Sequence, residues 1–511
     1  MIPAAVETPV LIVGGGPAGL TASLLLSLHG VSSLLIDKRA GESPLPRARG
    51  VHARAMEIMR VCGVEQDLRA VELEITPGAQ WRANLASPPI REDVPGATAK
   101  ADVSPCEGLS VSQDVFESVL REHARGHQAA QIQAGALLED FEVSAAGVEA
   151  TVADRDSGRR SRVRARWLIA ADGARGRIRE RLGIGLDGPA DLGRQWTVAF
   201  RADLSAYTGS RPRGIYFLTD TGAALIWTHP DHRWVISMPG VAGDRDPRAT
   251  VRETLAIPGL AVEVLSVGHW TAAAQTAGRY SEGPVFLVGD AAHRFPPAGA
   301  TGVSAAMHDA HNLAWKLAAV WRGHAGPALL ESYAAEREPV GVRNADETGT
   351  AWTRLFTTSG PPFAGRSLAQ LDMGYQYRSA VITGDGSPDP DPPGSCYQPS
   401  AVPGCRAPHR WLDSGTSTID LFRRDFVLLT AEPGAPWRAA AAAASRSLGI
   451  PVDSHVITSR GWPDTYGITP GGAVLVRPDG HVAWRCGTTP PPGPITPRDR
   501  VLAALKAGTA T

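Results

Sequence analysis

The sequence predicts an α/β protein in which a parallel sheet is interrupted by a second, antiparallel sheet and followed by a small α/β domain. Three observations support this prediction. An apolar strand enters a glycine-rich turn and a helix at residues 10–29, a similar buried strand returns at 285–288, and short strands separated by turn residues follow Leu192. Continuous apolar strands are typical of parallel sheets, whereas short strands joined by Asp, Gly and Pro turns indicate an antiparallel meander.

The N-terminal turn has the pattern of a dinucleotide-binding unit. An apolar strand precedes Gly14-x-Gly16-x-x-Gly19, and a helix and a second strand follow and end at Asp37. In such a unit the glycines let the backbone approach a pyrophosphate, and the acidic residue accepts hydrogen bonds from ribose hydroxyls. Pro17 stands in the first helical turn, where it removes no intrahelical hydrogen bond. We therefore expect a Rossmann-like domain that binds a nucleotide.

Length, charge and cysteine content narrow the class of protein. The 511 residues are enough for two or three domains, and 43% hydrophobic with 20% charged residues is typical of globular proteins. A formal net charge of -1 gives no general attraction to nucleic acid or to an anionic membrane, and the N-terminal residues fit neither a signal peptide nor a membrane span. Five cysteines without a Cys-x-x-Cys pair indicate reduced thiols in a cytoplasmic protein. We expect no nucleic-acid partner, no membrane partner and no metal.

The remaining elements follow from periodicity and turn signals. Helical spacing of apolar residues predicts helices at 53–62, 113–125, 303–321, 331–337 and 436–448. Apolar runs bounded by turn residues predict strands at 34–36, 167–171, 215–218, 223–228, 234–238, 285–288, 426–430, 473–476 and 481–484. The segment 384–394 is rich in Pro and Gly, and it marks a domain boundary.

These elements divide the chain into segments. The nucleotide-binding domain is expected in two parts, 1–190 and 275–355, and a segment near 75–110 is expected to belong to the second sheet domain. That second sheet domain is expected at 191–274. A helical or linker segment at 356–394 then leads to a terminal domain at 395–511, which is a normal size for an independent core.

Four motifs, taken in order along the chain, carry a resemblance to one family. They are the glycine turn at 14–19, an Asp-Gly motif in 171–179, Gly289-Asp290 with Ala-Ala-His293, and Pro296-Pro297 with the turn to Gly302. Together they resemble the class A flavoprotein monooxygenases, or aromatic hydroxylases, of the para-hydroxybenzoate hydroxylase fold. Residues 46–57 and 309–317 resemble the polyketide-tailoring and phenol-hydroxylating branch, and 403–412 and 477–485 resemble its thioredoxin-like terminal domain.

This resemblance implies an activity. A flavoprotein of this type uses FAD as cofactor, NADPH or NADH as co-substrate, and O2. It hydroxylates a phenolic, polycyclic aromatic secondary metabolite through a flavin C4a-hydroperoxide, as in polyketide antibiotic biosynthesis. Without a cysteine pair, the terminal domain is expected to have no redox role, because thiol exchange needs paired thiols. A monomer or a homodimer is expected.

The resemblance also assigns residues to the cofactor. Asp37 is expected at the adenosine ribose, Asp290 at a ribityl or ribose hydroxyl, and Asp172 near the flavin and the approaching nicotinamide. Arg47 and Gln113 match positions that hold the phosphates and the ribityl chain, with Arg49 as an alternative to Arg47. The full set of expected FAD contacts is Gly14, Gly16, Pro17, Ala18, Gly19, Asp37, Lys38, Arg47, Gln113, Asp172, Gly289, Asp290, Pro297, Gly299, Thr301, Gly302 and Val303.

The turn before the long helix has a physical reason to lie beside the flavin. Gly299 to Gly302 lead into the N-terminus of the helix, where unpaired amides and the positive end of the dipole favour negative charge. Directed at the N1/C2 edge, this end stabilises an anionic reduced flavin. The family usually has Gly-Gly-Gln-Gly-Met-Asn at this point. Thr301 and Ser304 are shorter here, which is expected to affect flavin position or the hydroperoxide lifetime.

Substrate contacts and the catalytic base are less specified. Candidates to stack on a planar substrate are Tyr216, Trp227, His229 and Trp234 on the inserted strands, with Trp81 and Trp270 beside them, although each aromatic residue taken singly fits a core residue better. The catalytic residues are unknown. His229 and His293 are candidates for a base by residue type, and His293 also fits a role in ordering its loop.

Other functions stay open at this stage. Baeyer–Villiger oxygenation on the same scaffold would give a ring-expanded product. A flavin protein that shields a reactive pathway intermediate, without strong NAD(P)H-driven turnover, is a second alternative. A scaffold built around the terminal domain is a third, and absence of bound flavin would support it.

Overall fold

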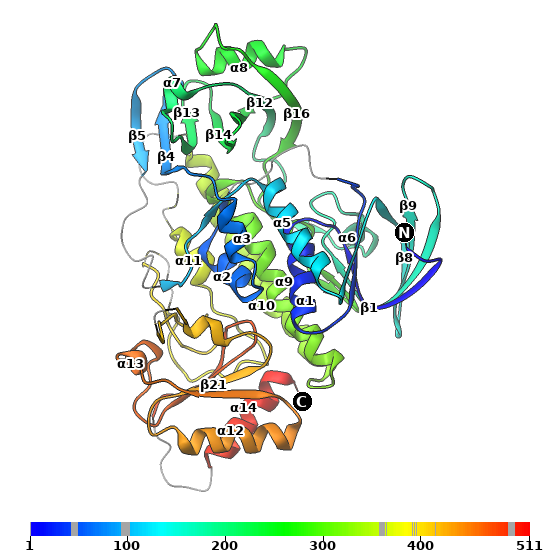
Figure 1. Ribbon diagram of the computed structural model, residues 1–511, viewed down its shortest axis with the longest axis vertical. Coiled ribbons are helices and arrows are strands. Elements are labelled where there is room, and N and C mark those ends of the chain that lie inside the picture. Colours follow the sequence, from blue (N-terminus) through cyan, green and yellow to red (C-terminus); the bar gives the residue numbers. More distant parts are fainter. Residues whose placement is uncertain are drawn as a thin grey trace.

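A computed structural model describes residues 2–41, 50–93, 103–356, 363, 365–390, 392, 394, 396–413, 415–488 and 496–510. Figure 1 shows the inserted sheet at one end of the molecule, the nucleotide-binding domain in the middle and the terminal domain at the other end. Across these residues, no helix combines the length and apolar character that crossing a membrane requires.

The largest sheet has eight strands, in the order β18-β19-β10-β1-β2-β7, and β9 and β8 extend it from β10. Pairing is parallel between β1 and β10, between β1 and β2, and between β10 and β19. The predicted return of the chain to one interrupted sheet is therefore confirmed. Its strands are β1 (Ala5–Val13), β2 (Ser33–Asp37), β7 (Ala130–Ala134), β8 (Ala136–Ser144), β9 (Gly147–Asp154), β10 (Arg160–Ala170), β18 (Ser281–Glu282) and β19 (Val285–Leu287).

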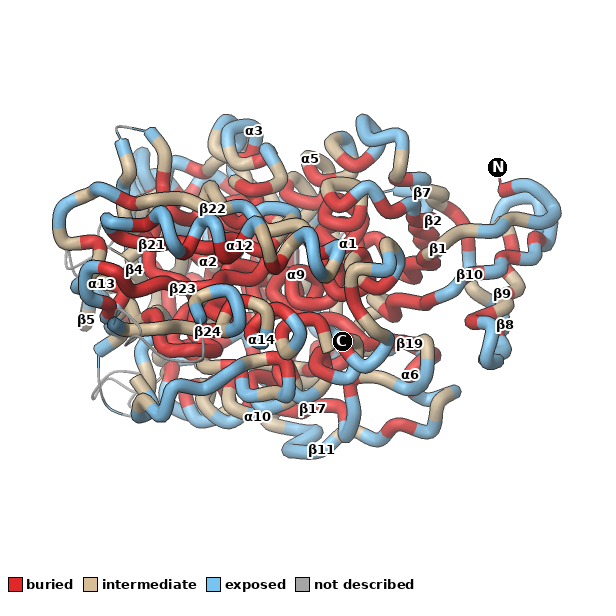
Figure 2. Tube along the Cα trace, turned by 90° about the horizontal axis from the view of Figure 1, so that it is seen from below, coloured by how far each residue is buried: buried red, intermediate tan, exposed pale blue. Residues whose placement is uncertain are grey.

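Helices cover this sheet and contact one another. α1 begins at Pro17 and ends before Gly30, whose φ of +69° stops the helix in the left-handed region. α9 packs along α1, and Figure 2 shows that α9 runs through the buried interior. The helices are α1 (Pro17–Leu28), α2 (Ala53–Val61), α3 (Glu65–Ala70), α5 (Gln113–Gly126), α6 (Arg177–Arg181), α9 (Thr301–Trp321), α10 (Glu331–Arg354) and α11 (Leu368–Met373). Short pairs and turns complete the domain: β3 (Gly50–Val51), β6 (Leu109–Ser110), β11 (Leu186–Asp187), β17 (Gln275–Ala277), β20 (His293–Arg294), η1 (Gly289–Ala291), η2 (Ala298–Ala300) and η3 (Pro327–Leu330).

The helix predicted at 331–337 is longer than expected. α10 continues through Pro339 to Arg354, although an internal proline removes a helical hydrogen bond. Beyond the proline, Val340, Asn344 and Ala351 are buried, and α10 packs against β17. This tertiary packing outweighs the local cost of the proline.

The inserted sheet has seven strands, in the order β16-β12-β15-β14-β13-β4-β5. β4 and β5 come from the segment before residue 94, and β4 pairs in parallel with β13, so the predicted antiparallel meander is extended by one parallel pair. The elements are β4 (Thr76–Arg82), β5 (Pro89–Asp93), β12 (Arg194–Arg201), α7 (Ser205–Thr208), β13 (Arg213–Leu218), β14 (Ala223–His229), β15 (Arg233–Pro239), α8 (Pro247–Leu255) and β16 (Glu263–Thr271).

The terminal domain has a four-stranded sheet, in the order β22-β21-β23-β24. β21 and β22 are parallel and joined by α12, whereas β23 and β24 are antiparallel, which is a thioredoxin-like arrangement. The five cysteines are free thiols in the described residues, so this domain holds no dithiol pair there. Its elements are η4 (Thr418–Leu421), β21 (Phe426–Thr430), α12 (Ala435–Leu448), β22 (Val452–Val456), α13 (Trp462–Tyr466), β23 (Ala473–Val476), β24 (Val482–Cys486) and α14 (Pro497–Thr509).

Buried charges join the terminal domain to the nucleotide-binding domain. Glu336 of α10 accepts hydrogen bonds from Arg477 at 2.6 and 3.0 Å and from Lys316 of α9 at 2.8 Å. Arg477 also pairs with Asp479, and the carbonyl of Asp479 accepts a hydrogen bond from Arg54 of α2 at 2.6 Å. All these side chains are nearly inaccessible to solvent. The domain contact therefore depends on the charges being paired, because an unpaired buried charge is costly.

We predict that replacing Glu336 by Gln lowers the free energy of unfolding by about 3–5 kcal/mol, because Arg477 and Lys316 would keep buried charges without their carboxylate. Burial would raise the pKa of Glu336, but Arg477 and Lys316 lower it to about 2. Its contribution to stability is therefore complete above its ordinary pKa of 4.5 and is lost as the pH falls towards 2. Denaturant titrations of both proteins between pH 7 and pH 3 measure the two effects.

The matched control is Glu139→Gln, which breaks a solvent-exposed pair with Arg160 at 2.7 Å. This change should alter the free energy of unfolding by less than about 1 kcal/mol. A Glu336→Gln loss no larger than that of the control would show that the domain contact does not depend on the buried charges.

Candidate active site

In the turn after β1, neighbouring parts of the chain leave no room for a side chain at two of the three glycines of the Gly14-x-Gly16-x-x-Gly19 pattern. A Cβ on Gly14 would lie 2.1 Å from the carbonyl oxygen of Ala171, and a Cβ on Gly19 would lie 2.0 Å from that of Gly14. At Gly16 the nearest atom would be 3.8 Å away, a carboxylate oxygen of Glu117. Gly16 therefore leaves an approach to the N-terminus of α1 open, where the amides of the first turn favour a phosphate.

Side chains around this turn hold its shape. Asp37 ends β2, and its carboxylate accepts hydrogen bonds from the amide of Gly15 at 3.1 Å and from the amide of Arg39 at 3.0 Å. Gln113 begins α5 and donates to Glu117 at 2.7 Å, on the same oxygen that lies near Gly16. Burial raises the pKa of Glu117, which lowers the cost of a carboxyl group next to a phosphate site. Lys38 is exposed, and Arg47 lies outside the described residues.

Asp172 lies directly after β10 and organises the turn that follows. One of its carboxylate oxygens accepts a hydrogen bond from the amide of Ile178 at 3.2 Å. The other oxygen is buried and has no partner in the described part of the chain. Burial raises the pKa of Asp172. This buried oxygen lies against Gly176, because a Cβ there would be 2.2 Å from it.

The Gly-Asp motif is the start of a segment that we call the flavin loop (residues 289–302). Gly289, with a φ of +59°, is wedged between α1 and α9, because a Cβ there would lie 3.0 Å from Ala306 and 3.1 Å from Ala18. Its amide donates to the carboxylate of Asp309 at 2.9 Å. The next residue, Asp290, is exposed and has no hydrogen-bond partner among the described residues, so its carboxylate is free to contact a ligand.

His293 does not fit the role of catalytic base. It is 1% exposed, its Nε2 bonds the same Asp309 oxygen at 2.9 Å, and its ring stacks on Phe295 at 4.4 Å between centroids. A general base has to reach a substrate proton. The structure thus assigns His293 to ordering of the flavin loop, which was the other reading of the sequence.

The end of the flavin loop leads into the N-terminus of α9. Gly299 and Ala300 have positive φ values of +72° and +55°, and they turn the chain so that the helix begins at Thr301. A Cβ on Gly302 would meet no protein atom within 4 Å, whereas the Thr301 side chain is buried and its hydroxyl has no partner in the described structure. Pro297 is exposed and Val303 is half-buried beside this helix start.

His52 is a member of the site that the sequence analysis missed. Its Nε2 lies 2.8 Å from the carbonyl oxygen of Gly299, and its amide donates to the Ser304 hydroxyl at 3.0 Å. Its Nδ1 is 3.8 Å from Asp372, a buried carboxyl group of α11 whose pKa burial raises. Ser304, shorter than the usual Asn, therefore ties α9 to the start of α2. His52 lies in the segment 46–57 that carries part of the family resemblance, but no local pattern there indicates a partner 247 residues away.

The face of the inserted sheet that contacts the flavin loop carries Trp81 but not Tyr216, Trp227 or Trp234. Tyr216, Trp227 and Trp234 lie in an apolar core with Val251 and Leu255 of α8. Alternate residues of a strand point to opposite faces, so their neighbours face the other way. That other face carries a second cluster in which Trp81, Ile215, Phe217 and Ala224 pack with Ala298 of the flavin loop and with Ala351, Trp352, Leu355 and Phe356 of α10 and the residues after it. Tyr216, Trp227 and Trp234 are thus core residues that support the sheet.

His229 also lies in a setting that does not suit a catalytic base. Its Nδ1 is 2.8 Å from Asp231 at the turn between β14 and β15, and its side chain is 36% exposed. Asp231 pairs with Arg201 and Arg233 as well. His229 therefore belongs to an exposed ion-pair cluster, whereas oxygen activation needs a site that excludes water.

Taken together, the groups fit an extended dinucleotide. α1 and α9 are neighbouring helices (Figure 1). The N-terminus of each helix has amides without intrahelical partners and the positive end of the helix dipole. The glycine turn adjoins Asp172, whose amide would lie 3.1 Å from a Cβ on Gly14, and Gly289 adjoins both Ala18 of α1 and Ala306 of α9. In the described residues no cluster of His, Cys, Asp and Glu is arranged to hold a metal ion.

Comparison with protein families identifies the class. A family described as FAD binding domain matches residues 7–348, and a family described as aromatic-ring hydroxylase, C-terminal, matches residues 400–507. The chain is an FAD-dependent aromatic hydroxylase. It belongs to the class A flavin monooxygenases, as the four motifs predicted.

Individual relatives of the hydroxylase agree with this class. The tetracenomycin A2 monooxygenase-dioxygenase of Streptomyces glaucescens is 37% identical over 543 residues, covering 95% of this chain and 94% of the relative. The flavin-dependent monooxygenase PieE, solved with FAD and substrate, matches with a TM-score of 0.89 and 30% identity over 99% of both chains. Aklavinone-11 hydroxylase, in a ternary complex with FAD and aklavinone, matches with a TM-score of 0.88 and 31% identity over 100% of both chains.

We predict that Gly302→Ala weakens FAD binding by at least about tenfold without destabilising the apoprotein. A methyl group at this position meets no protein atom within 4 Å, and Ala is a better helix former than Gly. A loss of affinity would therefore report a ligand at this point. Thermal unfolding of the apoprotein and FAD titration by flavin fluorescence give the two values.

The matched control is Gly19→Ala, whose methyl group would lie 2.0 Å from the carbonyl oxygen of Gly14. This variant should lower the Tm of the apoprotein as well as its FAD affinity. If Gly302→Ala binds FAD as tightly as the wild type, the N-terminus of α9 is not at the flavin.

Proposed function

We propose that this hydroxylase uses NADPH or NADH and O2 to hydroxylate a polycyclic phenol. The observation that carries the proposal is the apolar cluster between the inserted sheet and the flavin loop, because it brings a planar, water-excluding surface to Ala298. Relatives named for tetracenomycin and aklavinone, both at 35–37% identity, support a substrate of fused aromatic rings. The five free thiols favour a cytoplasmic enzyme, and a monomer or homodimer stays our expectation.

The cofactor would be held by the groups that surround the two helix N-termini. We propose that the turn at 14–19 and Gln113 bind its phosphates, Asp37 its adenosine ribose, and Asp290 its ribityl chain. When bound, the flavin supplies hydride acceptance from the nicotinamide and activation of O2 at its C4a carbon. Amides at the start of α9 would stabilise negative charge at the N1/C2 edge, and His52 would hold the Gly299 carbonyl in place.

The substrate would lie between the inserted sheet and the flavin loop. Five half-buried side chains lie on this face of the sheet. Three of them are apolar, Ile215, Ala224 and Ile226. The other two, Thr197 and Ser237, are polar, and their hydroxyl oxygens are 3.4 Å apart. Trp270 donates to the Thr197 hydroxyl at 2.9 Å and lies edge-on to Trp352. A flat apolar face with few polar groups suits a polycyclic phenol, because the rings stack and the hydroxyls find donors.

The test is oxidation of NADPH and of NADH by the purified holoenzyme with a panel of phenolic polycycles, followed by exact-mass analysis of products. Each turnover should consume one NAD(P)H and one O2, transfer one oxygen atom to an aromatic carbon and release water. A lactone product would show that the reaction is Baeyer–Villiger oxygenation and not hydroxylation. Absence of substrate-dependent NAD(P)H oxidation across the panel would favour a flavin protein that shields an intermediate.

Within this assay, we predict that Ala224→Phe lowers the yield of product per NADPH by at least about fivefold and releases hydrogen peroxide instead, because the added ring would occupy the substrate position. Trp227→Phe is the matched control on the opposite face, beside α8, and should keep the coupling within about twofold of wild type. FAD content should be unchanged in both. A larger loss of coupling in Trp227→Phe than in Ala224→Phe would show that the substrate binds on the face carrying Tyr216, Trp227 and Trp234.

A further inference from the structure

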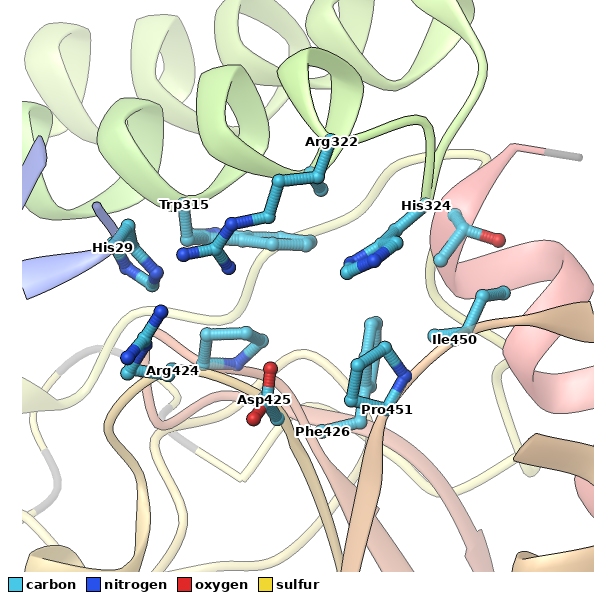
Figure 3. Close-up of a pocket in the computed structure, with 12 residues that line it drawn as sticks. His29, Trp315, Arg322, His324, Arg424, Asp425, Phe426, Ile450 and Pro451 are labelled. Carbon is cyan, nitrogen blue, oxygen red and sulfur yellow. The ribbon is translucent and has the colours of Figure 1, made fainter. Parts of the chain in front are cut away.

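A hollow lies at the contact between the nucleotide-binding domain and the terminal domain (Figure 3), and none of its lining residues belongs to the flavin loop. Its volume is about 320 Å³ including the opening to solvent. One wall comes from the ends of α1 and α9, and the other from the start of β21 and the segment before β22. α1 and α9 begin at the proposed flavin site and end at the hollow. At 1.5 Å per residue, the 12 residues of α1 span about 18 Å and the 21 residues of α9 about 32 Å, which is the distance of the hollow from that site along each helix.

The side chains around this hollow carry an excess of positive charge. Arg322 follows α9 and Arg424 precedes β21, and the Nη2 atoms of both lie within 3.8 Å of the point where a side chain on Gly30 would begin. Figure 3 shows their guanidinium groups with the His29 ring at one end of the hollow and His324 at the other. Asp425 is the one carboxylate in the lining, and in the described residues neither arginine forms a hydrogen bond or an ion pair.

Two buried groups in the lining also lack partners. His29 is 2% exposed, and its Nδ1 has no hydrogen bond in the described structure. Trp315 is equally buried, and its indole N–H has no acceptor there. Burial, then Arg322 and Arg424, lower the pKa of His29 to about 3, which shows the positive field at this point. Native proteins rarely leave buried polar groups unpaired, so this lining points to a missing acceptor.

We propose that this hollow binds a phosphate group, as inorganic phosphate or as the phosphomonoester of a small molecule, and that the bound dianion joins the two domains. Guanidinium groups pair with phosphate oxygens in a fixed, bidentate geometry, and the two arginines come from different domains. The helices contribute their C-terminal ends here, which do not attract anions. Binding therefore depends on the side chains of Arg322, Arg424 and His29.

The experiment measures the Tm of the FAD-loaded enzyme against inorganic phosphate, against glycerol 3-phosphate and against NaCl at matched ionic strength. The FAD-loaded enzyme is used so that the phosphate sites of the cofactor are filled. We expect saturating phosphate to raise the Tm by about 2 °C or more beyond the NaCl effect. A shift with inorganic phosphate alone assigns the free ion, and a shift with glycerol 3-phosphate assigns a phosphomonoester.

Arg424→Gln and Arg322→Gln should abolish this shift, and the ligand-free Arg424→Gln enzyme should be no less stable than wild type because a repulsion is relieved. Arg423→Gln is the matched control, since Arg423 is exposed, donates to the carbonyl of Asp420 and does not line the hollow. It should keep the full shift, and NADPH-dependent turnover should be unchanged in all three variants. The proposal is overturned if wild type shows no shift beyond NaCl, or if Arg424→Gln shifts as much as Arg423→Gln.

Discussion

The buried carboxylate of Asp309 is the constraint on which the flavin loop depends. It stands in the middle of α9 and holds the amide of Gly289, the ring of His293 and the guanidinium of Arg337, each at 2.7–2.9 Å. Burial alone would raise the pKa of this carboxyl, but Arg337 and His293 lower it, so it carries its charge inside the core. The start of the flavin loop is thereby fixed to α9, the helix into which the loop leads and whose N-terminus is the proposed electrostatic partner of the flavin.

The same network of buried charges extends to the terminal domain. Arg337 is adjacent in sequence to Glu336, and Glu336 is neutralised by Arg477 from the terminal domain. Without that domain, Glu336 would lose Arg477 and would keep only Lys316 of α9 as its charged partner among the described residues. The terminal domain thus contacts the nucleotide-binding domain through packing and charge pairing. That it has no redox role stays a prediction.

Much of the fold follows from local sequence patterns. The glycine turn at 14–19, the returning strand near Phe286 and the helix after Gly302 each have a strong local signal, because strand period, glycine spacing and helix period act over a few residues. Long-range pairs have no such signal. His52 and Gly299 are 247 residues apart, and Glu336 and Arg477 are 141 residues apart.

The inserted sheet shows a second limit of pattern reading. Both faces of β13 and β14 are apolar, since α8 covers one and the flavin loop with α10 bounds the other. Alternation along these strands separates Tyr216 from Phe217 but does not tell which of them faces the cofactor. The larger aromatic residues lie on the side of α8, where they build the core of the inserted domain.

The most direct test of this account is the FAD dissociation constant of Asp309→Asn, measured by fluorescence titration of the folded apoprotein. Asn keeps an acceptor for Gly289 but removes the charge that orders Arg337 and His293. His293→Gln, which breaks one arm of the network, provides a second variant if the first is poorly folded. The account predicts FAD binding weaker by at least about tenfold in Asp309→Asn, with a smaller loss in His293→Gln. Wild-type FAD affinity in both folded variants would contradict it.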